Sequence, residues 1–370
     1  MSPDPERAAV ASASRRNFLD GLLKLAASAV AGGTAVSLVA AAAVASGRTR
    51  GNAVIDVRAH GAAGDGIHDD TSSFQAAVDA LPEAGGTLIV PAGAYLIDPT
   101  RSVRLRSRMH LSLATGARLV AKPNAAPRAY VLLAEQVENV EISGGRIIGE
   151  RDSHLAASGE WGHGIRIRGC SAVTVRDIHI SRCWGDGISA GGIRLVKGGP
   201  SRPGRDYVFE NVVCAGNRRQ GLTLGSSRHV RVRGCTFSDT GGTPPGAGID
   251  IEPDTGVASD IVIENCLVQG NRGPGISLYK RAAGVTVRKC TIERNRGDGI
   301  LAVTAIDCVF ADNIIRDNRL KGILLRTGSR NVRVTRNRLR GNDRGRGGKR
   351  QVRVAGDSRA IRIAADNIIE

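Results

Sequence analysis

Short runs of alternating apolar and polar residues dominate this chain. Residues 173–178 read Val-Thr-Val-Arg-Asp-Ile, and residues 285–288 read Val-Thr-Val-Arg. Alternation with a period of two is typical of a β-strand that buries one face. No helical periodicity of comparable strength follows residue 81. The pattern therefore predicts an all-β chain.

One short segment near the N-terminus departs from this pattern. Residues 70–80 read Asp-Thr-Ser-Ser-Phe-Gln-Ala-Ala-Val-Asp-Ala, with apolar side chains at helical spacing. Asp70 or Thr71 supplies the polar N-cap that begins many helices. We expect a short amphipathic helix here that covers the open first coil of the strand region.

The strands belong to an internal repeat. A Gly-x-Gly-Ile-like element recurs, and its middle residues lie 23, 34, 27, 27, 24 and 23 positions apart. These middle residues are His163, Asp186, Gln220, Ala247, Pro274, Asp298 and Lys321. Asparagine precedes most of the elements, and cysteine recurs at positions 235, 266 and 290. A period near 24 built from short strands and Gly/Asn turns predicts a β-solenoid, in which stacked coils share one long core.

The composition agrees with a solenoid. The chain has 48 glycines among 370 residues and only 3% aromatic residues. Glycine suits the turns between strands, and a narrow core favours Val and Ile over aromatic side chains. The seven cysteines are too few for a disulfide scaffold, so we expect the periodic cysteines to form an inward stack of buried thiols.

Two insertions interrupt the repeat, one around residues 198–204 and one at residues 241–245. Insertions in solenoids collect on one face, which is often the binding face. The net charge of +17 permits a polyanionic partner. The basic residues are spread along turns, as on a solvated face, so we expect no nucleic-acid partner.

The N-terminal segment has the features of an export signal. Ser-Arg-Arg-Asn-Phe-Leu at residues 14–19 precedes an uncharged run from 25 to 45 that ends in Ala-Val-Ala. This arrangement resembles the bacterial twin-arginine signal, which implies export of a folded protein to the periplasm or beyond. An uncleaved membrane anchor is the alternative. We expect a signal peptide at residues 1–45 and one β-helix domain at 46–370.

The start of the predicted domain resembles a known superfamily. Residues 57–66 read Val-Arg-Ala-His-Gly-Ala-Ala-Gly-Asp-Gly, Asp69, Asp70 and Thr71 follow, and residues 85–95 read Gly-Gly-Thr-Leu-Ile-Val-Pro-Ala-Gly-Ala-Tyr. These segments resemble the opening of the pectate lyase superfamily domain of rhamnogalacturonase- and epimerase-like proteins. The resemblance implies a single-stranded right-handed parallel β-helix that acts on or binds carbohydrate polymers. It also places Asp65, Asp69 and Asp70 in the N-terminal cap as structural carboxylates.

The coils are also similar to those of polygalacturonases, whose active site lies on consecutive coils. At the matching places this chain has Gly-His-Gly at 162–164, Gly-Asp-Gly at 185–187, Arg-Gln-Gly at 219–221 and Asp-Ile-Glu at 250–252. Only Asp186 falls on a matching catalytic carboxylate. The basic pair that would hold a uronate is replaced by Asp250 and Glu252.

Polar residues outside the core should stack into a groove over about five coils. The predicted catalytic residues are Asp186, His163, Asp250 and Glu252. The predicted substrate-binding residues are Trp161, Trp184, Arg166, Arg168, Gln220, Tyr279, Lys280 and Arg281. Higher coils carry Leu301, Val303 and Leu324 at the equivalent places, so the polar patch is local. The two tryptophans are 23 residues apart and should stack on adjacent coils, where aromatic faces suit sugar rings.

These residues allow several chemistries. A carboxylate such as Asp186 raises the basicity of a neighbouring imidazole, so His163 and Asp186 could form a general base. Asp250 and Glu252 point the same way from one strand and could divide acid and base roles in glycoside hydrolysis. They could equally hold Ca²⁺, although no cofactor is strongly indicated. Lys280 or Tyr279 could neutralise a sugar acid or transfer a proton in β-elimination or epimerisation.

The sequence thus predicts an exported protein that cleaves glycosidic bonds in a polysaccharide, as a hydrolase or a lyase. A uronate epimerase and a non-catalytic carbohydrate-binding or surface protein are the alternatives.

Overall fold

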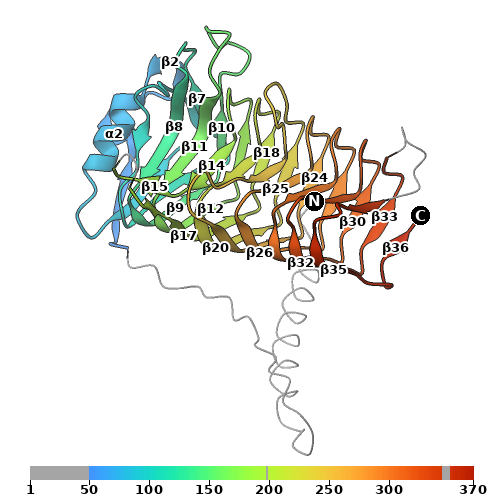
Figure 1. Ribbon diagram of the computed structural model, residues 1–370. Coiled ribbons are helices and arrows are strands. Elements are labelled where there is room, and N and C mark those ends of the chain that lie inside the picture. The colour runs from blue at the N-terminus through green and yellow to red at the C-terminus, as the bar shows by residue number, and fades with distance from the viewer. Residues whose placement is uncertain (1–49, 197–198, 344–350) are drawn as a thin grey trace, which may run out of the picture. The chain divides into compact units, whose positions relative to one another are not determined.

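The computed structural model describes residues 50–196, 199–343 and 351–370, and these form a parallel β-helix (Figure 1). The predicted signal peptide lies outside the described residues. Among the described residues, no helix is long and apolar enough to cross a membrane.

Three long parallel sheets, here called A, B and C, form the faces of the helix. Sheet A contains β1 (Ala53–Asp56), β3 (Gly86–Val90), β6 (Met109–Leu113), β9 (Glu138–Ser143), β12 (Ser171–Arg176), β17 (Gly204–Glu210), β20 (Ser227–Arg233), β23 (Ala258–Glu264), β26 (Ala282–Arg288), β29 (Ile306–Ala311), β32 (Arg330–Thr335) and β35 (Arg359–Ile363). Sheet B contains β2 (Asp65–Asp69), β4 (Gly93–Ile97), β7 (Ala117–Ala121), β10 (Arg146–Ile148), β13 (His179–Ser181), β18 (Val213–Ala215), β21 (Thr236–Ser238), β24 (Leu267–Gln269), β27 (Thr291–Glu293), β30 (Ile314–Arg316), β33 (Arg338–Arg340) and β36 (Ile368–Ile369). Sheet C contains β5 (Val103–Arg104), β8 (Arg128–Glu135), β11 (Trp161–Arg168), β14 (Ile188–Gly191), β19 (Leu222–Leu224), β22 (Ile249–Ile251), β25 (Ile276–Tyr279), β28 (Ile300–Val303), β31 (Ile323–Arg326) and β34 (Val352–Val354).

Each coil between β3 and β34 contributes one strand to each sheet, whereas the first coil (β1, β2) and the last coil (β35, β36) have no strand in sheet C. The apolar residue after each Gly-x-Gly turn lies directly over its equivalent in the next coil. These residues are Ile165, Ile188, Leu222, Ile249, Ile276, Ile300 and Ile323, and all are fully buried. The repeat read from the sequence is therefore the coil of the structure, and the predicted fold class is confirmed.

Buried asparagines connect the coils on one side of the core. The side-chain amide of Asn271 donates to Oδ1 of Asn295 at 2.8 Å, and Asn295 donates in the same way to Asn318 at 2.9 Å. Asn318 continues the ladder to Asn342, which donates to Oε1 of Gln351. Each Oδ1 also accepts a backbone N–H of the preceding coil. The ladder satisfies polar groups that would be costly to bury alone.

The cysteines lie inside the helix as predicted. All seven are buried and none forms a disulfide. Burial raises the pKa of Cys183 and Cys214 well above the usual thiol value. Their role is to fill the narrow core as small apolar side chains.

The N-terminal end is covered by η1 (Val57–His60) and α2 (Thr71–Asp79), at the blue end of Figure 1. Phe74 of α2 is fully buried and packs edge-on against Tyr95, with ring centroids 5.2 Å apart. Asp70 is the N-cap residue, but its carboxylate accepts hydrogen bonds from the backbone of Ala63 and Gly64 rather than from the helix. Asp70 therefore fixes the preceding loop.

The other cap carboxylates also hold backbone and side chains of the cap. Asp69 accepts the backbone N–H and hydroxyl of Thr71 and binds Lys122 at 2.8 Å, and Asp65 accepts the backbone N–H groups of Ile67 and His68. No group of three His, Cys, Asp or Glu side chains with a metal-binding arrangement occurs among the described residues.

Candidate functional site

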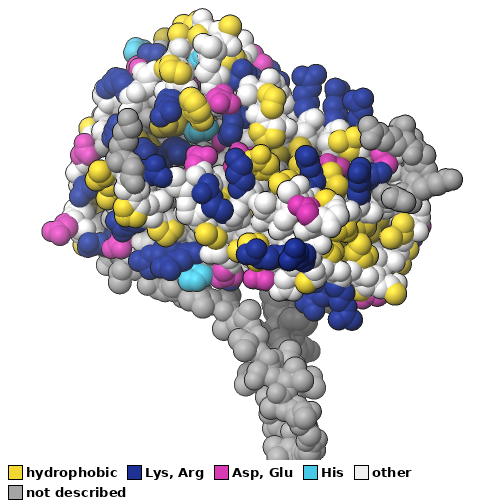
Figure 2. Space-filling view, viewed as in Figure 1, with side chains coloured by type: hydrophobic (Ala, Val, Ile, Leu, Met, Phe, Trp, Pro, Cys, Tyr) yellow, Lys and Arg dark blue, Asp and Glu magenta, His cyan; other side chains and the backbone are white. Residues whose placement is uncertain are grey.

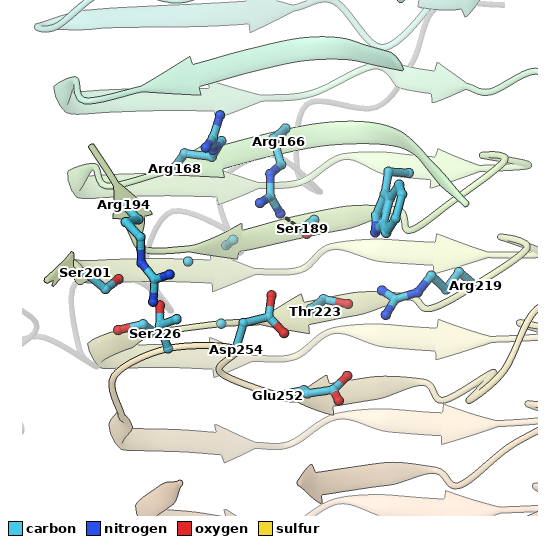
Figure 3. A pocket seen from close by; sticks show the side chains of 16 residues that line it. Arg166, Arg168, Ser189, Arg194, Ser201, Arg219, Thr223, Ser226, Glu252 and Asp254 are labelled. Atoms are coloured by element: carbon cyan, nitrogen blue, oxygen red, sulfur yellow. Dashed lines mark hydrogen bonds between the residues drawn. The ribbon is translucent and has the colours of Figure 1, made fainter. Parts of the chain in front are cut away.

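A cavity of about 320 Å³ opens on the outer face of sheet C (Figure 3). It contains four arginines and two carboxylates among hydroxyl side chains and glycines. Its lining consists of Trp161, Arg166, Arg168, Ser189, Ala190, Gly191, Gly192, Arg194, Ser201, Arg219, Thr223, Gly225, Ser226, Glu252, Asp254 and Thr255.

Strand register explains why these polar residues meet. Arg166 of β11 pairs with Ser189 of β14, and Ser189 pairs with Thr223 of β19. The same outward column continues through Asp250 of β22 and Ser277 of β25, then turns apolar at Leu301 and Leu324. The polar patch is thus local, at the coils that the sequence indicates.

One of the two predicted insertions forms a wall of the cavity. The long repeat interval folds into an antiparallel pair, β15 (Ile193–Arg194) and β16 (Ser201–Arg202), which brings Arg194 and Ser201 to the cavity. The segment after β22 forms another wall with Glu252, Asp254 and Thr255. Residues 241–245, the second insertion, do not line the cavity.

His163 and Asp186 lie together on neighbouring coils, as expected from the repeat. Nδ1 of His163 accepts the backbone N–H of Asp186 at 3.0 Å and lies 3.5 Å from its Oδ2. Both side chains are buried and neither lines the cavity. The expected rise in His163 basicity is wrong, because burial and the charges of Arg166 and Arg219 lower its pKa well below the usual value.

Arg194 is one arginine of the cavity that the sequence reasoning left out of the site, and Arg219 is another. Its guanidinium lies 3.3 Å from Oδ1 of Asp186 and 3.4 Å from Oε2 of Glu160, and it also lines the cavity. Burial raises the pKa of Asp186, and the charge of Arg219 opposes that rise. The repeat contains a feature that could have identified this residue. Five of the seven Gly-x-Gly-like elements begin with glycine, whereas this element begins with Arg219.

Asp250 and Glu252 differ in exposure, although Asp250 lies in β22 and Glu252 directly follows that strand. Glu252 lines the cavity, whereas Asp250 is buried and accepts a hydrogen bond from Nε2 of Gln220 at 3.1 Å. Burial, followed by the negative charge of Glu252, raises the pKa of Asp250 to about 7. Gln220, predicted to bind substrate, is itself fully buried and reaches Asp250 rather than the cavity.

The two tryptophans have different surroundings. Trp161 lines the cavity with 37% of its surface exposed, and Arg128 lies 4.6 Å from its ring centre. The ring of Trp184 stacks on His154 at 4.0 Å and lies 3.8 Å from the guanidinium of Arg218. Two groups this close to one ring have to occupy opposite faces. The predicted sugar stacking on Trp184 is therefore wrong, since both of its faces are covered.

The predicted binding residues of the next coil lie outside the cavity. Lys280 lies 4.7 Å from the ring centre of Tyr279, and the Arg281 guanidinium donates to the backbone carbonyl of Pro253 at 3.1 Å. Arg281 supports the wall that carries Asp254, to whose carbonyl it also donates. None of the three lines the cavity.

Arg166 and Arg168 of β11, which the sequence predicts as substrate-binding residues, both line the cavity. Arg166 donates to the hydroxyl of Ser189. Burial, followed by the charge of Arg168, lowers the pKa of Arg166. Arg168 binds Glu135 of the preceding coil at 2.7 Å. The cavity therefore combines the side chains of Arg166, Arg194 and Arg219 with the carboxylates of Glu252 and Asp254.

Residues 134–281 and 202–368 match the family described as "Right handed beta helix region". The chain belongs to this family. The matched segments include most strands of all three sheets and every strand that lines the cavity.

Individual relatives are similar over part of their length. The uncharacterized protein YclG of Bacillus subtilis is 33% identical over 209 residues, which are 51% of this chain and 36% of that protein. The chain spans about a quarter to a third of the length of the first curated relatives that it matches.

Two solved structures show the same fold. The A-module of the mannuronan C-5 epimerase AlgE4 of Azotobacter vinelandii gives a TM-score of 0.56 at 20% identity, covering 85% of this chain and 100% of that one. The Dettilon tailspike protein gives a TM-score of 0.64 at 14% identity, and the match covers 85% of this chain and 66% of the tailspike chain. The family match confirms the predicted right-handed β-helix, and the two solved structures share that fold.

Proposed function

We propose that this protein is an exported enzyme that hydrolyses glycosidic bonds in a polysaccharide bound in the cavity on sheet C. The observation that supports this proposal most directly is a pair of carboxylates, Glu252 and Asp254, on one wall of a cavity that is otherwise rich in arginine and hydroxyl groups. Hydrolysis of a glycosidic bond needs two carboxyl groups that flank it, one to protonate the leaving oxygen and one to assist attack.

Glu252 and Asp254 take these two roles in the proposal. They replace the pairing of Asp250 with Glu252, because Asp250 is buried and does not reach the cavity. Asp250 has a supporting role two residues before Glu252, where burial and the charge of Glu252 raise its pKa to about 7. Asp186, whose backbone N–H donates to His163, holds Arg219 at the cavity through an ion pair.

The lining favours hydrolysis over proton abstraction from the sugar ring. β-Elimination and epimerisation need a base for a carbon-bound proton, and Lys280 and Tyr279, the residues considered for it, lie outside the cavity. The lining contains no His, Lys or Tyr side chain. Trp161 lines the same cavity and is 37% exposed, and an aromatic face suits the apolar face of a sugar ring.

The export part of the proposal is supported by the twin-arginine-like segment at residues 14–19 and the apolar run that follows it. A periplasmic or secreted location gives the enzyme access to polysaccharide outside the cytoplasm. The buried, unpaired cysteines agree with export in a folded state.

A panel of polysaccharides incubated with the purified protein tests this function. New reducing ends without ultraviolet-absorbing product are the expected result. An unsaturated, ultraviolet-absorbing product would instead indicate a lyase, and altered uronate stereochemistry without cleavage would indicate an epimerase. Binding without any reaction would instead indicate a non-catalytic carbohydrate-binding surface protein.

A further inference from the structure

The outer face of sheet C becomes apolar in the coils beyond the cavity. Strands β25, β28 and β31 pair in register, so Ser277 pairs with Leu301 and Leu301 with Leu324. Tyr279 pairs with Val303 in the same way. The four apolar side chains are partly exposed, because alternation along each strand points them away from the core.

Leu320 adds a further apolar side chain in the turn that leads into β31. It stands at the repeat position that Arg219 occupies at the cavity, and it is 42% exposed. Exposed apolar side chains that gather in one place often mark an interaction surface. We call these residues the apolar strip: Tyr279, Leu301, Val303, Leu320 and Leu324.

A row of arginines follows the turns that lead into the same strands. Arg272, Arg296 and Arg319 each follow an asparagine of the buried ladder, and all three are exposed. The backbone N–H of Arg296 donates to the carbonyl of Asn271, and that of Arg319 donates to the carbonyl of Asn295. Adjacent strands of a parallel sheet are about 4.8 Å apart, so the row places like charges close together on successive coils.

Two more cations stand at the other ends of these strands. Lys280 directly follows β25 and lies 4.7 Å from the ring centre of Tyr279, and Arg326 is the last residue of β31. Within the described residues, none of the row arginines and neither of these two cations has a carboxylate oxygen within 4.0 Å. Asp298, in the turn before β28, is buried and accepts the backbone N–H of Lys321. The apolar strip therefore lies between two cationic edges.

We propose that the apolar strip and its two cationic edges dock this protein on a lipid bilayer that contains anionic lipid. Each cation close to an anionic membrane surface favours binding through its attraction to the phosphate headgroups. Apolar side chains between the cations reach the boundary between headgroups and acyl chains, which adds a hydrophobic contribution. On the face drawn in Figure 2, apolar side chains lie next to Lys and Arg over the coils toward the C-terminal strands. This surface lies outside the cavity, so its role does not depend on the proposed hydrolysis.

The arrangement favours a membrane over two other occupants. A second copy of the chain would bring its own unpaired cations against the same edges, and like charges repel. A soluble acidic polymer would neutralise the cations but leave the apolar strip in water. A membrane surface offers anionic groups and an apolar layer together.

Co-sedimentation of the full chain with lipid vesicles tests this docking face. The vesicles consist of phosphatidylcholine alone or of phosphatidylcholine mixed with phosphatidylglycerol. We expect at least ~10-fold tighter binding to the mixture, and a loss of at least ~10-fold in that affinity for Arg296→Gln/Arg319→Gln. Leu320→Ser should weaken binding to the mixture by about 3-fold or more.

The double variant Arg333→Gln/Arg362→Gln is the matched control. It also removes two exposed arginines, which pair in register on sheet A rather than sheet C. Because salt screens charges that are far from the membrane, this variant should bind the mixed vesicles almost as well as the natural protein. Residues 1–45 are the same in every variant, so they do not account for a difference between variants.

Equal affinity for the two kinds of vesicle, or equal losses in the two double variants, would overturn the proposal. Unchanged binding by Leu320→Ser, together with competition by soluble polyphosphate, would assign the cations to an acidic polymer instead of a membrane. Self-association without lipid that Leu320→Ser abolishes would assign the apolar strip to a second copy of the chain, which also contradicts membrane docking.

Discussion

The guanidinium of Arg219 lies 3.3 Å from the fully buried carboxylate of Asp186, and the same side chain lines the cavity above it. Arg219 stands where most coils have the first glycine of their turn. It thus connects a buried charge to the surface at which we propose substrate binds.

Replacing Arg219 with methionine should destabilise the protein strongly. The change leaves Asp186 buried without its counter-charge, and breaking a buried pair in this way costs about 3–5 kcal/mol. Chemical denaturation of Arg219→Met and of the double variant Asp186→Asn/Arg219→Met measures the effect, and the double variant should recover much of the loss. Arg336→Gln, which removes an exposed ion pair with Asp312, should cost less than about 1 kcal/mol. Additive losses in the double variant would show that the two residues do not depend on each other.

Much of the fold follows from the sequence because each coil repeats the same local rules. The glycine elements, the asparagine ladder and the buried cysteines recur at the coil period, so one coil predicts the next. The cavity is less regular. The burial of Asp250 and Gln220 depends on side chains of several coils and on the path of the wall after β22, which strand alternation does not encode. The covering of Trp184 likewise depends on His154, from the loop before the first Gly-x-Gly element, and on Arg218 of the next coil.

Asn318 should be essential to the stability of the upper coils. Its Oδ1 accepts two hydrogen bonds from Asn295, and its amide donates to Ile292 and Asn342. Asn318→Ala leaves several buried polar groups unpaired, at about 1–3 kcal/mol for each group that water does not reach. Arg319→Ala, at the exposed neighbouring position, should change the free energy of unfolding by less than about 0.5 kcal/mol. Equal unfolding midpoints for the two variants would contradict the role of the ladder.

Titration of free thiols should separate the native from the unfolded protein. All seven cysteines are buried and unpaired, so a water-soluble thiol reagent should react slowly or not at all under native conditions. After unfolding without reductant, seven thiols per chain should react. A count of five or fewer would reveal disulfides and contradict the structure of the core.

The buried Asp250 should make stability depend on pH. Its pKa is raised to about 7 in the folded protein, whereas the unfolded value is about 3.9. The folded state therefore binds more protons between these values, and the stabilising contribution, complete below about pH 4, is lost as the pH rises to about 7. Asp250→Asn should consequently become more stable relative to the natural protein as the pH increases from 5 to 8. Parallel stability curves for the two proteins over this range would show that Asp250 is ionised normally.

The most direct test of the proposed activity is the rate of reducing-end formation from a polysaccharide by the natural protein and by Glu252→Gln. The proposal predicts steady release of reducing ends by the natural protein and a loss of at least ~100-fold in the variant, with unchanged folding and polysaccharide binding. Glu264→Gln, which alters a carboxylate on β23 that pairs with Arg288 outside the cavity, should retain full activity. Equal rates for Glu252→Gln and the natural protein would contradict the proposed catalytic site.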